Sequence, residues 1–346
     1  MRKTPIQIPT LSSEDFSKIL PPSMNYPSLS ELFGHYSQVY LKHIASKMNS
    51  YTWFRFVESE SKNLIFKRMA TRILYRMMER EPADRYCAGN ENGYVIGELA
   101  EGLTSRGVNY KSVNEDGIGI FEREDELLLV GCDGVGDCLV GEVASFVILS
   151  LFDRHPEKTI QEVFSESVEV LLALGEKLEV EVPEFATFPN EISQAAVTAV
   201  SIKNNRCEIG QVGDVLLYHL RDGELRLLDQ NRQWLDLEKL KKLFADEQYL
   251  AQRHIISNAI GRNYDPYWMP AFLTLKKDDV LVLASDGLET LHPNEIFEVF
   301  EEFDDDREVL NALYNRCIEA NLKWNTSGSP LYTKPDNISI ILYRHK

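Results

Sequence analysis

Four short acidic motifs are the part of this sequence best suited to chemistry, and each stands where an apolar segment begins or ends. They are Asn114-Glu115-Asp116, Asp133-Gly134, Asp286-Gly287 and Asp336-Asn337. Carboxylates crowded together repel one another and take up protons, and hard divalent cations relieve that repulsion. Because Mg²⁺ and Mn²⁺ prefer oxygen ligands, the motifs predict a site for these ions.

Two of the four aspartates are followed by glycine. An apolar strand that ends in Asp-Gly places a carboxylate at the rim of a sheet, and the glycine leaves room for its backbone carbonyl to approach an ion. The sequence has no His/Cys cluster with zinc-site spacing. A single Asp-Gly pair is common in turns, so the prediction depends on all four motifs occurring together.

The segments that must position these motifs show strand and helix patterns from residue 91 onward. Apolar runs on both sides of the charged stretch Glu122–Glu126 predict a hairpin, and Arg221-Asp222-Gly223 predicts a second hairpin turn. Strands grouped by hairpins favour antiparallel sheets with helices on the outer faces. The predicted helices cover about 138–153, 159–178, 236–252, 293–301 and 306–323.

The first part of the chain differs from the rest in charge. Residues 1–86 carry 13 Lys/Arg and 8 Asp/Glu, a net of +5, whereas the remainder carries −22. This contrast predicts an N-terminal arm and helical extension over 1–86 and a separate domain over 87–346. Within the extension, an arginine stripe and an apolar face predict helices that dock on the acidic domain of the same chain, with a solvated basic face as the alternative. The stripe is Arg68, Arg72, Arg76 and Arg80, and the apolar face is Phe66, Met69, Ile73 and Met77.

The bulk composition restricts the class of protein. The chain has 346 residues, 44% of them hydrophobic, which suits a folded core. A net charge of −17 argues against a nucleic-acid partner. No apolar run is long enough to cross a membrane, and the first residues lack the pattern of a signal peptide. Five scattered cysteines without a C-x-x-C pair predict reduced thiols and a cytoplasmic protein.

Read in order, the acidic motifs resemble those of the type 2C (PPM) protein phosphatase family. The resemblance covers roughly residues 90–346 and includes Gly213-Asp214 and the stretch 256–262. It implies an α+β fold, with a central β-sandwich of two antiparallel sheets flanked by helices in a four-layer αββα arrangement. It also implies hydrolysis of phosphoserine or phosphothreonine in a phosphoprotein substrate, by a water that two Mg²⁺ or Mn²⁺ ions activate.

The resemblance assigns roles to individual residues. Asp133 matches the carboxylate that bridges the two ions, and Gly134 matches the neighbouring carbonyl ligand. The acidic pair of the first motif would hold metal-bound waters, and Asp214 would help to bind a third, weaker ion. The metal ligands implied in this way are Glu115, Asp116, Asp133, Gly134, Asp214, Asp286 and Asp336.

Several positions depart from the family pattern. Lys111 stands where the family has an arginine that binds the substrate phosphate, and a lysine lacks the bidentate fork of arginine. Arg106 is a nearby substitute, and Thr290 stands where the family has an acidic residue. Besides an active protein phosphatase, the sequence is therefore compatible with a catalytically weak or inactive binding protein of the same fold, and with a hydrolase of small phosphates.

Overall fold

The computed structural model describes most of the chain from residue 85 onward. Within 85–346 the description omits 89–91, 109–113, 136–137, 139–140, 182–192, 230–232, 254–255, 257, 262–263, 266–269 and 328–332. The predicted extension, with its arginine stripe and apolar face, therefore lies outside the described residues. So do Lys111 and the pair Gly136-Asp137.

The described strands form two antiparallel sheets. One sheet has the strand order β1-β4-β5-β6-β7-β11, and the other has the order β10-β9-β8-β12-β13-β3-β2. The first contains Tyr86–Ala88 (β1), Gly117–Glu122 (β4), Leu127–Gly134 (β5), Ala195–Lys203 (β6), Arg206–Val212 (β7) and Ala271–Thr274 (β11). The second contains Asn92–Ile96 (β2), Ala100–Ser105 (β3), Leu216–Arg221 (β8), Glu224–Leu228 (β9), Trp234–Asp236 (β10), Val280–Ala284 (β12) and Ile338–Arg344 (β13).

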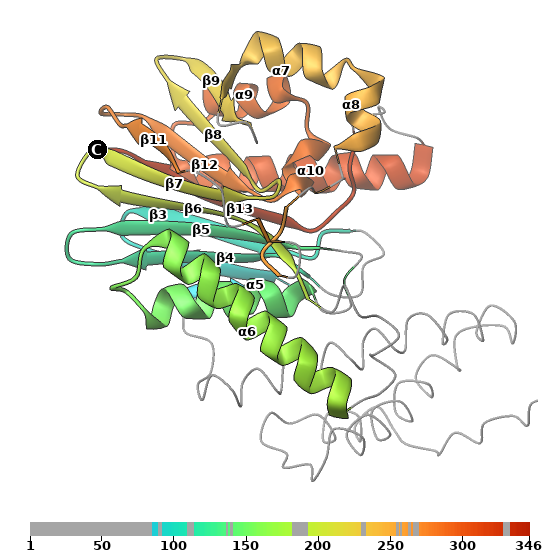
Figure 1. Cartoon of the computed structure of the whole chain (residues 1–346). Helices are drawn as coiled ribbons and strands as arrows, with labels where there is room; N and C mark the ends of the chain where they lie inside the picture. The colour runs from blue at the N-terminus through green and yellow to red at the C-terminus, as the bar shows by residue number, and fades with distance from the viewer. Residues whose placement is uncertain are drawn as a thin grey trace, which may run out of the picture. The chain divides into compact units, whose positions relative to one another are not determined.

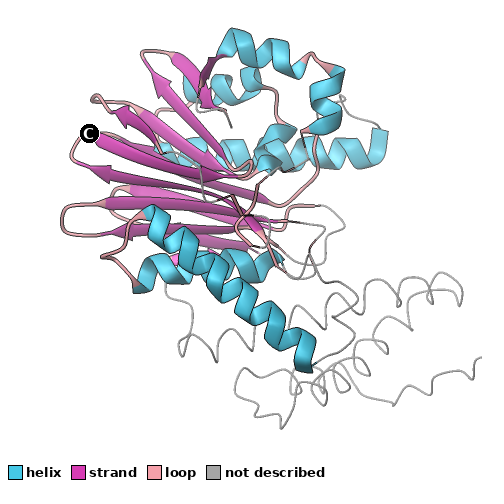
Figure 2. Ribbon diagram, viewed as in Figure 1, coloured by secondary structure: helices cyan, strands magenta, loops and turns pink. Residues whose placement is uncertain are grey.

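Helices cover the outer faces of both sheets, and Figures 1 and 2 show the strands stacked between two groups of helices. Gly141–Arg154 (α5) packs on β4 and β5, and α6 follows it at Ile160–Glu181. The opposite group packs on β9, β13 and their neighbours. It contains Leu237–Phe244 (α7), Glu247–Gln252 (α8), the 3₁₀ helix Asp286–Thr290 (η3), Pro293–Glu302 (α9) and Asp306–Ser327 (α10). The predicted sandwich of two antiparallel sheets flanked by helices is confirmed.

Two apolar layers belong to the described part of the core. One layer lies between the sheets and includes Leu129, Val200 and Ile341, and the other lies between the second sheet and α9 and α10. The strand β5 is buried along nearly its whole length because one face meets the other sheet while the opposite face meets α5. Burial on both faces explains why its sequence is a continuous apolar run rather than an alternating one.

Local turn chemistry agrees with both predicted hairpins. The strands β4 and β5 flank the charged turn, and β8 and β9 are joined by Asp222 and Gly223. These two residues have φ of 52° and 73°, the left-handed pair that a tight two-residue hairpin requires.

One predicted helix was wrong in its bounds. The helix expected over 236–252 is two helices, because the side chain of Asp246 caps the backbone N–H groups of Gln248 and Tyr249 and so starts α8 as a separate helix. Tyr86, the last residue of the predicted extension, lies in β1, where it pairs with Gly119 and its side chain is buried. None of the described helices is both long and apolar enough to span a bilayer.

Candidate metal site

The acidic motifs of the first sheet lie beside each other at one edge. The strands β4 and β5 are antiparallel, and Gly117 pairs with Cys132, so the start of β4 and the end of β5 meet there. Glu115 and Asp116 immediately precede β4, and Asp133 is the next-to-last residue of β5. Burial is the main cause that raises the pKa of the Cys132 thiol, and the nearby charges of Asp116 and Asp133 raise it further.

The acidic motifs of the second sheet meet in the same way. Ala284, at the end of β12, pairs with Ile340 of β13, so Asp286 and Asp336 lie near one edge of that sheet. The backbone N–H of Ser285 donates to the carbonyl of Ser339 at 2.9 Å, and the N–H of Ser339 donates to the Ser285 hydroxyl at 3.0 Å. These bonds hold the start of η3 against the start of β13.

One side chain joins the two edges. The amide oxygen of Asn337 accepts the backbone N–H of Glu115 at 2.9 Å, and its Nδ2 donates to the carbonyl of Arg106 at 3.1 Å. The carbonyl of Glu115 accepts the Ser145 hydroxyl at 2.7 Å and the N–H of Gly134 at 3.1 Å. The four motifs, which come from two sheets, are therefore held at the same end of the sandwich.

The glycine after Asp133 is required by close backbone packing. A Cβ atom at Gly134 would lie 2.5 Å from the carbonyl carbon of Gly141 and 2.7 Å from the carbonyl oxygen of Glu115. No side chain fits where three backbone segments approach so closely. Gly287 is enclosed in the same way by the carbonyl of Asn337.

Asp214 and Asp286 carry buried oxygens that accept no hydrogen bond from any other described residue. Both carboxylate oxygens of Asp214 and the Oδ1 of Asp286 are in this state. Burial raises the pKa of Asp214, the charge of Lys334 and a hydrogen bond from the backbone N–H of Asp214 itself lower it, and Asp336 raises it again. A buried carboxylate without hydrogen-bond donors is costly unless a cation neutralises it, so these oxygens are suitable ligands for a hard divalent ion.

A lysine that the sequence analysis missed lies among these carboxylates. The ammonium of Lys334 contacts Oδ2 of Asp286, and the Lys334 side chain is only 13% exposed. Burial lowers the pKa of Lys334, while Asp214, Asp133 and Asp336 raise it through their charges. Among the residues that the structure describes, no three His, Cys, Asp or Glu side chains are arranged as ligands of one metal ion. The donors are of the kind that Mg²⁺ or Mn²⁺ takes, and an ammonium lies among them.

A second feature that sequence reasoning missed connects α8 to η3. The Tyr249 hydroxyl donates to Oε1 of Glu289 at 3.1 Å, and Nη1 of Arg253 lies 3.6 Å from Oε2 and donates to the Glu289 carbonyl at 3.2 Å. Burial raises the pKa of Glu289 to about 7, although Arg253 and Tyr249 lower it. The contacts fix the 3₁₀ helix that begins with Asp286 against α8 and the residue that follows it.

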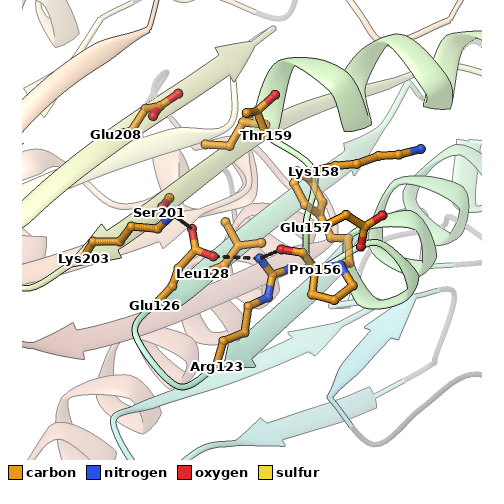
Figure 3. Close-up of a pocket in the computed structure, with 12 residues that line it drawn as sticks. Arg123, Glu126, Leu128, Pro156, Glu157, Lys158, Thr159, Ser201, Lys203 and Glu208 are labelled. Atoms are coloured by element: carbon orange, nitrogen blue, oxygen red, sulfur yellow. Dashed lines mark hydrogen bonds and ion pairs between the residues drawn. The ribbon is translucent and has the colours of Figure 1, made fainter.

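The polar pocket in Figure 3 lies at the opposite end of β5 from Asp133. Arg123 donates to Glu126 at 2.7 Å and to the carbonyls of Phe152 and Pro156 at 2.9 and 3.0 Å. Glu126 also accepts the Ser201 hydroxyl. These polar groups of the pocket are hydrogen-bonded to one another, and the bonds connect the β4–β5 turn to the end of α5.

All seven expected metal ligands lie in described segments. Glu115, Asp116, Asp133, Gly134, Asp214, Asp286 and Asp336 all belong to the described segments at that end of the sandwich. The metal-binding roles of these seven residues remain predictions. Lys111, which the sequence analysis expected to bind the substrate phosphate, lies outside the described residues.

Comparison with known proteins adds independent information. No family model matches the chain. The serine/threonine phosphatase Stp of Listeria monocytogenes is 25% identical over 255 residues, which cover 70% of this chain and 94% of that protein. Its counterpart in Listeria innocua is 24% identical over the same length.

The fold also matches solved structures. The S. agalactiae serine/threonine phosphatase aligns with a TM-score of 0.53 and 22% identity, covering 71% of this chain and all of that one. PppA of Pseudomonas aeruginosa aligns with a TM-score of 0.50 and 19% identity, covering 75% and 99%. The two-sheet sandwich of this chain is therefore the fold of these solved phosphatases, and its sequence is similar to that of Stp.

Proposed function

We propose that this chain is a metal-dependent phosphatase that hydrolyses phosphoserine or phosphothreonine in proteins. The observation that carries the proposal is the meeting of acidic segments from both sheets at one end of the sandwich, with buried oxygens of Asp214 and Asp286 that accept no hydrogen bond from any other described residue. The name of the Listeria relatives, serine/threonine phosphatase, supports the substrate class.

In this proposal the residues that hold divalent ions come from both edges. Asp133 and the carbonyl of Gly134 contribute from the first sheet, and Asp286 and Asp336 contribute from the second. Glu115 and Asp116 hold coordinated waters, and Asp214 supports a weaker third ion. Bound Mg²⁺ or Mn²⁺ supplies water activation and neutralises charge on the phosphoryl oxygens. Asn337 holds the two edges together, because its side chain is hydrogen-bonded to the backbone of Glu115 before β4 and to that of Arg106 after β3.

A catalytically weak or inactive binding protein is the second candidate. The contact between Lys334 and Asp286 favours it, since an ammonium then occupies an oxygen that a metal ion would use. The two candidates differ in whether divalent ions bind and support turnover.

The test is hydrolysis of p-nitrophenyl phosphate and of a phosphothreonine peptide by the full chain. We expect turnover with Mn²⁺ or Mg²⁺, loss of turnover with EDTA and recovery when Mn²⁺ is added back. Full activity after exhaustive chelation would contradict metal dependence. A folded chain that binds Mn²⁺ but hydrolyses neither substrate would instead support the second candidate.

A further inference from the structure

The backbone of Lys334 is held in a fixed position by a buried threonine. The N–H of Lys334 donates to the Thr290 hydroxyl at 3.2 Å, and that hydroxyl also contacts the carbonyl of Lys334. The hydroxyl lies 3.1 Å from Oδ1 of Asn321, and both Thr290 and Asn321 are buried. Since Thr290 is the last residue of η3 and Asp286 is its first, the same short helix positions the lysine and its carboxylate partner.

The Lys334 ammonium lies among the carboxylates to which the proposed function assigns divalent ions. It contacts Oδ2 of Asp286, and its charge interacts with those of Asp133, Asp214 and Asp336. These four carboxylates are the ones that the proposed function assigns to divalent ions. One ammonium neutralises only part of their charge, so the cluster still attracts a divalent ion.

We infer that Lys334 is an internal cation that competes with a divalent ion for Asp286, so that binding of this ion displaces the ammonium from the carboxylate cluster. The inference rests on the proposed function. An ammonium and a divalent ion on the same buried carboxylate repel each other strongly, because the surroundings screen charge less than water does. The lysine therefore lowers the metal affinity of the site and neutralises part of its charge when the metal is absent.

The first experiment is calorimetric titration of the full chain with MnCl₂. Lys334→Met removes the charge and keeps an apolar stem of similar length, and we expect it to bind Mn²⁺ at least tenfold more tightly than the unmodified chain. Lys334→Arg keeps the charge and is expected to retain weak binding. The matched control is Lys277→Met, a lysine in the exposed turn before β12, which should not change the affinity.

Equal Mn²⁺ affinity in Lys334→Met and the unmodified chain would overturn the inference and leave the proposed function standing, because the lysine would then be a purely structural partner. Absence of Mn²⁺ binding by both proteins would overturn the proposed function and the inference together.

A second measurement needs no variant. Acetylation of Lys334 by acetic anhydride, followed by mass spectrometry, reports its accessibility in the unmodified chain. We expect Mn²⁺ to speed acetylation of Lys334 several-fold while the exposed Lys277 reacts at the same rate with and without metal. Slower or unchanged acetylation of Lys334 at saturating Mn²⁺ would show that the ammonium is not displaced.

Discussion

Asp133 lies at the end of a central strand, where its charge adds to that of several other carboxylates. Asp116 immediately precedes the neighbouring strand β4, and Lys334 provides a nearby positive charge. Removing one negative charge from a like-charged group relieves repulsion, so a neutral amide at this position is compatible with folding. The same change removes the ligand that the family resemblance assigns as a bridge between two ions.

We therefore predict that Asp133→Asn lowers kcat with p-nitrophenyl phosphate by two orders of magnitude or more while the melting temperature stays within a few degrees. The matched control is Asp278→Asn in the exposed turn before β12. Its φ of 68° is left-handed, a conformation that asparagine adopts readily. Turnover of Asp133→Asn equal to that of the control would show that the bridging assignment is wrong.

At the scale of elements, the edge opposite the metal site is held by a buried ionic cluster. Nε of Arg221, at the end of β8, donates to Oδ1 of Asp279 at 2.8 Å, and Nε2 of His219 lies 3.1 Å from Oδ2. Burial by itself raises the pKa of Asp279, but hydrogen bonds from Arg221, the N–H of Lys276 and His219 outweigh it and lower the pKa to about 2. The cluster joins β8 to the start of β12.

This lowered pKa predicts a specific dependence of stability on pH. The folded pKa lies below the unfolded value, so Asp279 stabilises the fold above about pH 4 and loses that contribution as the pH falls through about 2. Asp279→Asn should lower the free energy of unfolding by about 2 kcal/mol at pH 7. Urea denaturation in EDTA should show a smaller deficit at pH 3. Asp222→Asn, in the exposed β8–β9 turn, is the control, and a deficit for Asp279→Asn that does not vary with pH would contradict the assignment.

A second connection between elements joins α8 to η3. The contacts of Tyr249 and Arg253 with Glu289 fix α8 to the 3₁₀ helix that carries Asp286. A change in the position of α8 would therefore be transmitted to Asp286, a carboxylate of the proposed metal site.

At the scale of the whole molecule, the role of the basic extension is still a prediction from the sequence. Its apolar face would expose costly surface in water, at about 25 cal/mol per Å². We predict that deleting residues 1–84 lowers the melting temperature of the remaining chain. The deletion ends at residue 84 because the carbonyl of Arg85 accepts the N–H of Ile120 and Tyr86 begins β1.

Turnover of the same deletion separates two versions of that prediction. Unchanged kcat with a lower melting temperature supports a stabilising extension, and raised kcat supports an inhibitory one. Replacing the four arginines of the stripe by glutamine in the full chain measures the part due to charge. If the deletion changes neither quantity, the extension is an independent module and the docking prediction is wrong.

The sequence by itself determined the local structure and the type of chemistry. Buried runs such as the one ending at Asp133 predict strands because both faces must be covered, and Asp222-Gly223 predicts a tight turn because of its backbone conformation. Acidic residues placed at the ends of such runs predict carboxylates at a sheet rim. These features depend on neighbouring residues in the chain, and pattern and turn chemistry describe them adequately.

Only the tertiary structure decided which distant groups meet. The hydrogen bond between Glu115 and Asn337 joins residues that are 222 positions apart in the sequence, and nothing local in either segment specifies it. The placement of Lys334 on Asp286, and of Arg253 beside Glu289, likewise follows from how whole elements pack. Such contacts arise from long-range burial and from the need to neutralise charge out of water, and the sequence therefore predicted the carboxylates of the site but not the cation among them.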